Sequence, residues 1–235
     1  MVELIQGLRE AAVRANLQRI TRELEGSSRP QGRSGPARIL AATKYVALAN
    51  MPVLAAAGVQ LVGENRAQDL KEKWEAHGEL FEWHFIGQLQ SRRVRTILPC
   101  VGMIHSVASD SAMRELSRRA ELARPGLSIL VEVNLSGEEG KAGIRPGRLD
   151  EFIASSEVPV AGLMTMPPLS ADPEASRPWF AALRRLADER GLEHLSMGTS
   201  QDYLVAAQEG ASIVRIGTNL YNPHSPQTGP DAASD

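Results

Sequence analysis

The chain has 235 residues, of which 43% are hydrophobic, so it can bury one sizeable core or two small ones. A formal net charge of -2 and an ordinary 23% of charged residues exclude a disordered chain and provide no overall basic field for nucleic acid. The only cysteine, Cys100, excludes an internal disulfide framework and multi-cysteine metal sites, and favours a reducing, cytoplasmic location.

A leading helix is predicted first, within residues 1–25, where apolar side chains recur at helical spacing. A loop rich in Gly, Ser and Pro follows over residues 26–36. Eight short apolar runs then have the length and flanking residues of strands. They lie at residues 38–43, 60–63, 82–86, 102–107, 128–133, 158–163, 194–196 and 212–216.

Helical stretches such as 65–77, 109–122 and 174–190 separate these runs. The alternation predicts parallel strands joined by right-handed crossovers, and the count of eight favours a closed (β/α)8 TIM barrel over an open doubly wound sheet. Because residues 221–230 contain three prolines and cannot form a final helix, we expect the leading helix to fill that gap.

The predicted organisation is one domain over residues 1–222, followed by a flexible C-terminal tail over residues 223–235. Residues 1–10 mix charged and apolar side chains, so we expect no signal peptide. The apolar run at 53–62 is far shorter than the ~20 residues that a membrane helix needs. We therefore expect a cytoplasmic protein that associates with neither membranes nor nucleic acid.

The carboxyl ends of the strands are where a parallel barrel places its reactive groups. Lys44 directly follows the first apolar run, and desolvation of an amine at such a position favours its neutral, nucleophilic form. A lysine that reaches from the barrel rim into solvent is the alternative. Lys44 is thus a candidate for forming an imine with a carbonyl compound.

The seventh and eighth runs each end in a glycine and hydroxyl residues, at 198–200 and 217–218. Backbone N–H and side-chain O–H groups there can converge on an anion, and these two loops commonly hold a phosphate in barrels. Simple turns, with Ser200 capping a helix, are the alternative. Closure would place this cradle and Lys44 in one cavity with Arg215 between them, which suits an aldehyde that carries a phosphate.

Two further groups of residues point to no additional chemistry. His84 and His105 lack the companions of a metal site, so we expect them to line the barrel as hydrogen-bonding residues and expect no metal. The basic cluster at 92–95 lacks interleaved aromatics, which favours a solvated helix face over a nucleic-acid patch.

Several motifs, in order along the chain, resemble the pyridoxal phosphate homeostasis proteins, which are related to the N-terminal barrel domain of alanine racemase. The resemblance spans about residues 38–220. The matching segments are 40–46 (LAATKYV), 62–65 (VGEN), 83–90 (WHFIGQLQ), 104–107 (IHSV), 132–134 (EVN), 141–143 (KAG), 162–166 (GLMTM), 195–198 (LSMG) with Ser200, and 214–218 (VRIGT).

The resemblance implies an alanine racemase-like barrel that holds pyridoxal 5'-phosphate (PLP) as a Schiff base on Lys44. By the same match, the phosphate loop would comprise Thr199, Ser200, Gly217 and Thr218. Arg215 would approach the pyridine nitrogen, and Asn65 and Met164 would line the cofactor. Thr199 and Gln88 depart from the family's usual methionine and proline, and the end at residues 221–223 also differs.

The residues favour a carrier over a catalyst. In the position that the resemblance implies, a permanently protonated Arg215 would make the pyridine ring a poor electron sink, which disfavours transamination. A racemase also needs an acid or base on the opposite face, and no strand-end residue is a convincing one. We therefore expect a monomeric protein that buffers PLP or delivers it to apoenzymes, with indirect effects on amino-acid metabolism. A PLP-dependent amino-acid racemase and a Schiff-base aldolase are the alternatives.

Overall fold

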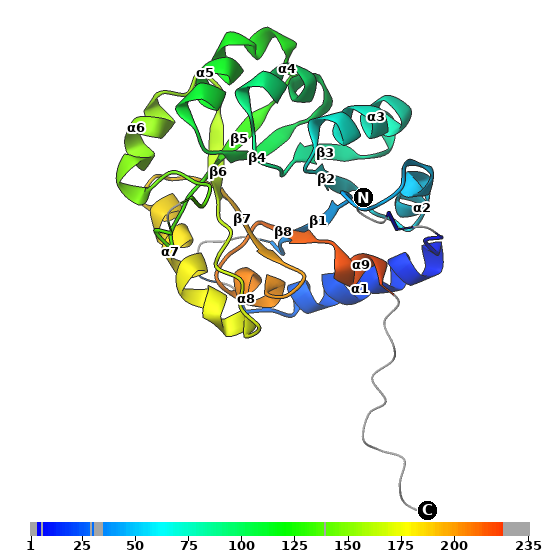
Figure 1. Cartoon of the computed structure of the whole chain (residues 1–235). Coiled ribbons are helices and arrows are strands. Elements are labelled where there is room, and N and C mark those ends of the chain that lie inside the picture. The colour runs from blue at the N-terminus through cyan, green and yellow to red at the C-terminus, as the bar shows by residue number, and fades with distance from the viewer. Residues whose placement is uncertain (1–3, 6, 29, 31–34, 139, 223–235) are drawn as a thin grey trace, which may run out of the picture.

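The computed structural model describes residues 4, 5, 7–28, 30, 35–138 and 140–222. Eight parallel strands form a closed barrel in which strands that are consecutive in sequence are neighbours (Figure 1). They are β1 (Arg38–Ala42), β2 (Leu61–Glu64), β3 (Glu82–Phe85), β4 (Met103–Val107), β5 (Ser128–Glu132), β6 (Val160–Met164), β7 (His194–Thr199) and β8 (Ile213–Ile216). Each overlaps one of the eight predicted runs.

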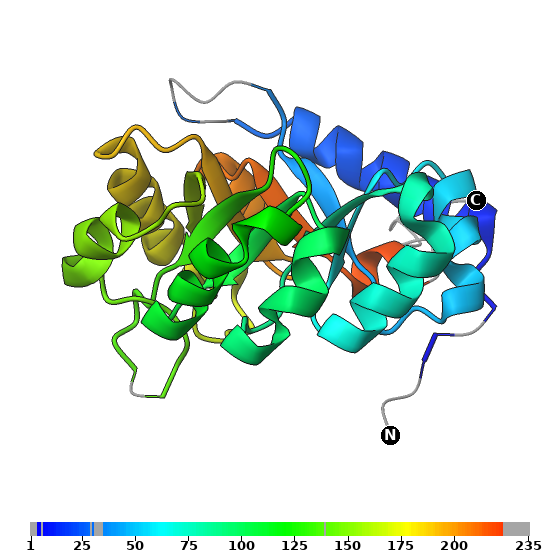
Figure 2. The ribbon, with the colours of Figure 1, turned by 90° about the horizontal axis from the view of Figure 1, so that it is seen from above.

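Helices surround the strands as an outer ring, which Figure 2 shows from a direction turned by 90°. They are α1 (Glu10–Glu25), α2 (Met51–Ala56), α3 (Ala67–His77), α4 (Val94–Ile97), α5 (Asp110–Arg118), α6 (Leu149–Ala154), α7 (Arg177–Asp188), α8 (Tyr203–Gln208) and α9 (Thr218–Tyr221). None of the helices in the described part of the chain has the length and apolar character needed to cross a membrane.

The barrel closes between its first and last strands, where Leu40 pairs with Arg215 and Ala41 pairs with Ile216. This closure confirms the predicted barrel and excludes the open doubly wound sheet. It also brings the carboxyl end of β1, with Lys44 just beyond it, next to the carboxyl end of β8. The two candidate regions of the sequence therefore become neighbours.

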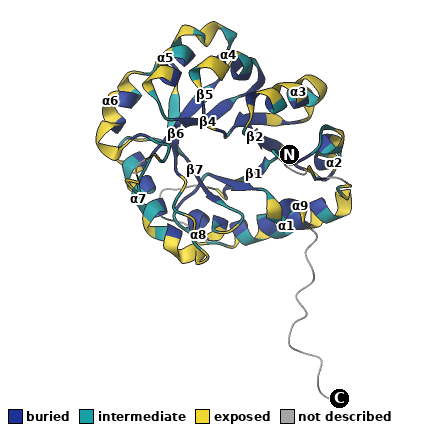
Figure 3. Cartoon of the chain, in the orientation of Figure 1, coloured by how far each residue is buried: buried dark blue, intermediate teal, exposed yellow. Residues whose placement is uncertain are grey.

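Most residues of the strands are buried (Figure 3). Their buried hydrophobic side chains belong to two separate clusters. Since side chains alternate along a strand, Leu40 faces the barrel interior while Ala41 faces the helices. The inner apolar cluster consists of Leu40, Leu61, Met103, Leu130, Met164 and Ile213. A large outer cluster between strands and helices supplies the remaining hydrophobic core.

The leading helix α1 begins at Glu10, later than predicted. Before it, Ile5 forms a parallel bridge with Val46 and Gly7 has a φ of 64°, so the chain there is not helical. Residues 1–3 and 6, at the predicted start, lie outside the described residues, as do the tail residues 223–235.

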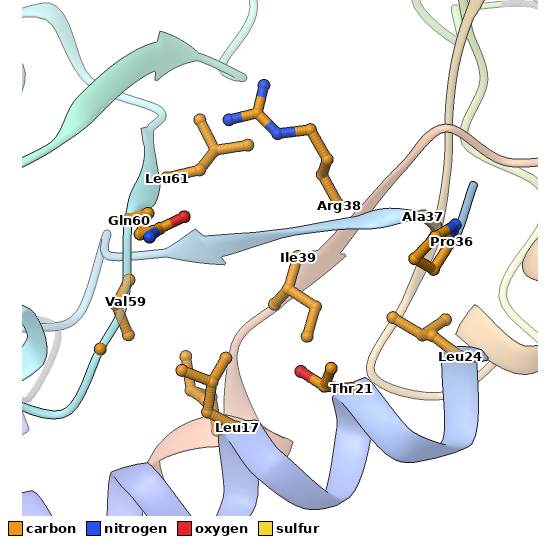
Figure 4. Close-up of a pocket in the computed structure, with 12 residues that line it drawn as sticks. Leu17, Thr21, Leu24, Pro36, Ala37, Arg38, Ile39, Val59, Gln60 and Leu61 are labelled. Carbon is orange, nitrogen blue, oxygen red and sulfur yellow. The ribbon is translucent and has the colours of Figure 1, made fainter. Parts of the chain in front are cut away.

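Helix α1 occupies the place of a last helix in the ring, between α2 and α8, as the sequence predicts. Leu17 and Leu24 of α1 face Ile39 of β1 across a small hollow (Figure 4). The side chain of Asn16 donates to the carbonyls of Leu220 and Asn222, at 3.1 and 2.9 Å. These contacts fix the end of the barrel strand that carries Arg215, because α9 directly follows β8.

Candidate functional site

A cavity of about 370 Å³ opens at the carboxyl ends of the strands. Its wall is built from segments that follow β1, β2, β3, β6, β7 and β8. Seven of the eight predicted site residues line it: Lys44, Asn65, Thr199, Ser200, Arg215, Gly217 and Thr218. The fold therefore gathers into one place residues that are up to 174 positions apart, from 44 to 218.

Lys44 lies in a tight turn directly after β1. Its Nζ is 4.7 Å from the centre of the Tyr45 ring. Among the described residues, it is the one lysine of four that has no carboxylate partner. The other three pair with glutamates: Lys71 with Glu75, Lys73 with Glu64 and Lys141 with Glu138. Lys44 is therefore the amine that is available to a ligand in the cavity.

The turn that carries Lys44 is anchored from below by a buried ion pair. Lys73 Nζ lies 2.6 Å from Glu64 Oε1 and donates to the carbonyl of Thr43 at 2.8 Å. The Thr43 hydroxyl donates to the same carboxylate oxygen at 2.6 Å. Since both the backbone and the side chain of Thr43 are held, the position of the following lysine is fixed.

Two backbone N–H groups converge on Ser200 at the other side of the cavity. The N–H groups of Gly217 and Asn219 donate to Ser200 Oγ at 3.2 and 3.4 Å. The side chain of Asn219 also donates to the Ser200 carbonyl at 2.7 Å. Ser200 thus faces the start of α9, just after β8, and is not the cap of α8, whose N-cap is Asp202. This hydroxyl and these N–H groups form a cradle suited to an anion.

The end of β7 requires a glycine at position 198. Its φ of +88° is disfavoured for other residues, and a Cβ there would lie 2.5 Å from Cβ of Ala206. Thr199 donates to Asp202 Oδ1 from its backbone N–H at 2.7 Å and from its hydroxyl at 3.1 Å. Threonine at this position thus stabilises the loop after β7, while the hydroxyl of its neighbour Ser200 forms part of the cradle.

Arg215 of β8 lines the same cavity as Lys44 and Ser200 and is almost fully buried. Its Nη1 donates to the carbonyl and hydroxyl of Ser196, at 2.9 and 2.6 Å. Its Nη2 donates to the carbonyl of Thr165 at 3.1 Å and to Met166 Sδ at 2.7 Å. Burial lowers the pKa of Arg215 to about 10, so the guanidinium remains a cation at neutral pH.

The side-chain oxygen of Asn65, Oδ1, is buried and has no hydrogen-bond partner among the described residues. The Asn65 backbone is held by the close approach of Gly87, where a Cβ would lie only 2.0 Å from the Asn65 carbonyl oxygen. An amide held rigidly with an unpaired oxygen is a suitable ligand-binding group.

Met164 is the one predicted site residue that does not line the cavity. It is buried one layer deeper, in the inner apolar cluster. Met166, two residues further along and 45% exposed, lines the cavity instead. Sequence reasoning missed Met166 and also Tyr221, which reaches the cavity from α9. The sequence held a signal for Met166, because side chains two residues apart on a strand share a face and Met166 is two residues beyond Met164.

No family model matches the chain. A pyridoxal phosphate homeostasis protein of Aquifex aeolicus is 41% identical over 219 residues, which cover 87% of this chain and 96% of that protein. The chain belongs to the pyridoxal phosphate homeostasis protein family. A second member, from Pseudomonas aeruginosa, is 34% identical over 220 residues, covering 90% of this chain and 95% of that protein.

Solved structures agree with membership of the pyridoxal phosphate homeostasis protein family. PipY of Synechococcus elongatus with PLP bound matches at a TM-score of 0.75 and 29% identity, over 89% of this chain and all of that chain. Alanine racemase from Corynebacterium glutamicum matches at a TM-score of 0.66 and 16% identity, over 97% of this chain and 65% of that chain. The latter likeness concerns the fold alone and confirms the predicted alanine racemase-like barrel.

Proposed function

We propose that this protein binds PLP covalently through Lys44 and serves as a PLP carrier in cofactor homeostasis. The observation that supports this most is the convergence of an unpaired amine, a buried cation, an unsatisfied amide oxygen and an anion cradle on one cavity. These groups fit an aromatic aldehyde that bears a phosphate. The binding of PLP to PipY supports the same assignment.

Each residue has a distinct part in this proposal. Lys44 would hold the aldehyde carbon through its amine. Ser200, Thr218 and the N–H of Gly217 would receive the phosphate, with Thr199 stabilising their loop. Arg215 would donate to the ring nitrogen, and Asn65 would offer its amide to the ring substituents. Met166 takes the contact role that the sequence assigns to Met164.

The arrangement favours a carrier over an enzyme. Bound PLP is a weaker electron sink when its ring nitrogen is unprotonated, and a cationic Arg215 beside that nitrogen would oppose protonation, which disfavours transamination. Tyr221 also lines the cavity, but burial and the nearby Glu64 raise its pKa, so its phenol remains neutral and is a weak base.

Absorption spectroscopy tests the proposal. Adding PLP should produce a violet-region band that is lost in Lys44→Ala and retained in Lys71→Ala, which removes an exposed lysine paired at 3.5 Å with Glu75. A colourless wild-type protein would contradict PLP binding and favour the aldolase alternative. Sustained incorporation of deuterium at the α-carbon of L-alanine would contradict the carrier and favour a racemase.

The proposal also covers the domain organisation, oligomeric state, location and partners of the protein. We propose that residues 1–222 act as one PLP-binding domain, that the protein is a monomer in the cytoplasm, and that PLP-dependent apoenzymes receive its cofactor. The single cysteine supports the location, because Cys100 is buried and burial raises its pKa to about 11, which makes it unreactive.

A further inference from the structure

A continuous series of polar side chains crosses the barrel interior below the cavity. Arg215 Nη1 donates to Ser196 Oγ at 2.6 Å, and Ser196 Oγ lies 2.8 Å from Nδ1 of His105. Nε2 of His105 lies 2.9 Å from Nδ1 of His84. Nε2 of His84 lies 2.9 Å from Oε1 of Glu82. We call these five residues, from β8, β7, β4 and β3, the polar relay.

The polar relay connects the two mouths of the barrel. Glu82 is the first residue of β3 and accepts hydrogen bonds from Arg38, the first residue of β1. Figure 4 shows Arg38 on the opposite side of β1 from Ile39, which faces α1, so Arg38 lies on the inner side at the amino-terminal mouth. Arg215 lies at the other end, in the wall of the cavity. The relay therefore spans the interior from mouth to mouth.

The protonation states of the relay follow from its surroundings. Hydrogen bonds from His84 and Arg38 lower the pKa of Glu82 to about 2, so this carboxylate is ionised. Burial lowers the pKa of His84 and of His105, so both imidazoles are neutral near pH 7. The other charged or titratable groups that face the relay are Arg38, Glu132, His194 and Asp202.

The two ends fix the direction of every hydrogen bond between them. A guanidinium can only donate, an ionised carboxylate can only accept, and a neutral imidazole does each once. His84 must then donate from Nε2 to Glu82 and accept at Nδ1 from Nε2–H of His105. Consequently, His105 accepts at Nδ1 from the hydroxyl of Ser196, whose oxygen accepts from Arg215.

We propose that His84, His105 and Ser196 are positioning residues that hold the Arg215 guanidinium in place and make its surroundings sensitive to the protonation of His84. A protonated His84 donates from both nitrogens, which reverses the tautomer of His105. The hydroxyl of Ser196 then has no acceptor within the relay, and its contact with Arg215 must rearrange. The hydrogen bonds of the polar relay do not depend on the proposed PLP function; that function is needed only to say that Arg215 faces the PLP ring.

Nitrogen-15 NMR of the histidine side chains, without added cofactor, tests the polar relay itself. At about pH 7.5, His84 and His105 should both be neutral Nε2–H tautomers. Single His→Phe variants would assign the signals. A neutral Nδ1–H tautomer or an imidazolium at either residue would overturn the proposal. The predicted tautomers in a protein that binds no PLP would support the relay and contradict the proposed function.

Binding of PLP tests whether the relay acts on the cavity. Loss of a hydrogen bond to a charged group is expected to raise the apparent Kd of Ser196→Ala about tenfold, and that of His105→Phe similarly. The band of bound PLP should titrate below pH 6.5 in the wild type but not in His84→Phe. Met103→Leu alters the inner apolar cluster and should match the wild type. Wild-type affinity and an unchanged acid titration in Ser196→Ala, which is the variant least disruptive to folding, would overturn the proposal.

Discussion

The buried ion pair below the Lys44 turn leads to a quantitative stability prediction. Lys73 Nζ lies 2.6 Å from Glu64 Oε1, and the side chain of Glu64 is fully buried. Lys73→Met keeps most of the aliphatic chain but leaves the Glu64 charge without its cation. Removing one partner of a buried pair typically costs about 3–5 kcal/mol of unfolding free energy. At about 2–4 °C per kcal/mol for a chain of this size, Tm should fall by about 6–20 °C.

Urea unfolding followed by circular dichroism, together with scanning calorimetry, measures this loss. The matched control is Lys71→Met on the same helix, because Lys71 makes an exposed pair with Glu75 and should cost at most about 0.5 kcal/mol. Adding Glu64→Gln to Lys73→Met removes the uncompensated charge and should restore part of the stability. If Lys73→Met and Lys71→Met agreed within about 1 kcal/mol, the buried pair would not anchor the turn as described.

Three further predictions concern the cavity and the polar relay. Gly198→Ala places a Cβ 2.5 Å from the Cβ of Ala206 at a φ of +88°. Urea unfolding should therefore show a loss of about 1–3 kcal/mol or more in unfolding free energy. Gly102→Ala, which has open space around it, should show a much smaller loss. Met164→Ala should destabilise the barrel by about 2–5 kcal/mol and leave PLP affinity nearly unchanged. Met166→Ala should weaken PLP binding and leave stability nearly unchanged. The reverse pattern would contradict the assignment of the two methionines. Because the pKa of Glu82 is lowered, its pairing with His84 and Arg38 stabilises the fold above about pH 4.5, and this stabilisation is lost as the pH falls towards 2. Denaturation at a series of pH values should show that Glu82→Gln lacks this pH-dependent part of the unfolding free energy.

The strands were predictable because each is a short apolar run between turn residues, and their number selected the closed barrel. Closure then placed Lys44 beside Arg215, since β1 and β8 become neighbours only in a barrel. The start of α1 was not predictable from helical spacing alone. Ile5 pairs with Val46, which lies 41 residues away, and such a long-range contact leaves no periodic signal in the segment.

The two methionines after β6 show where sequence reasoning about the site ends. Met164 and Met166 are two residues apart and therefore share a face, but they belong to different layers of the barrel. The register between β5 and β6 shifts near Ile129, which a sequence pattern does not reveal. Likewise, His84 and His105 were predicted as hydrogen-bonding residues of the barrel lining, which the structure confirms, but their contact depends on the register of β3 and β4.

Borohydride reduction of the PLP-treated protein, followed by peptide mass spectrometry, tests the central claim most directly. The chain has only four lysines, so the assignment is unambiguous. We predict a pyridoxyl adduct on Lys44 alone, because Lys71, Lys73 and Lys141 are each paired with a glutamate. An adduct on any of those three lysines in place of Lys44, or no adduct at all, would contradict the proposed site.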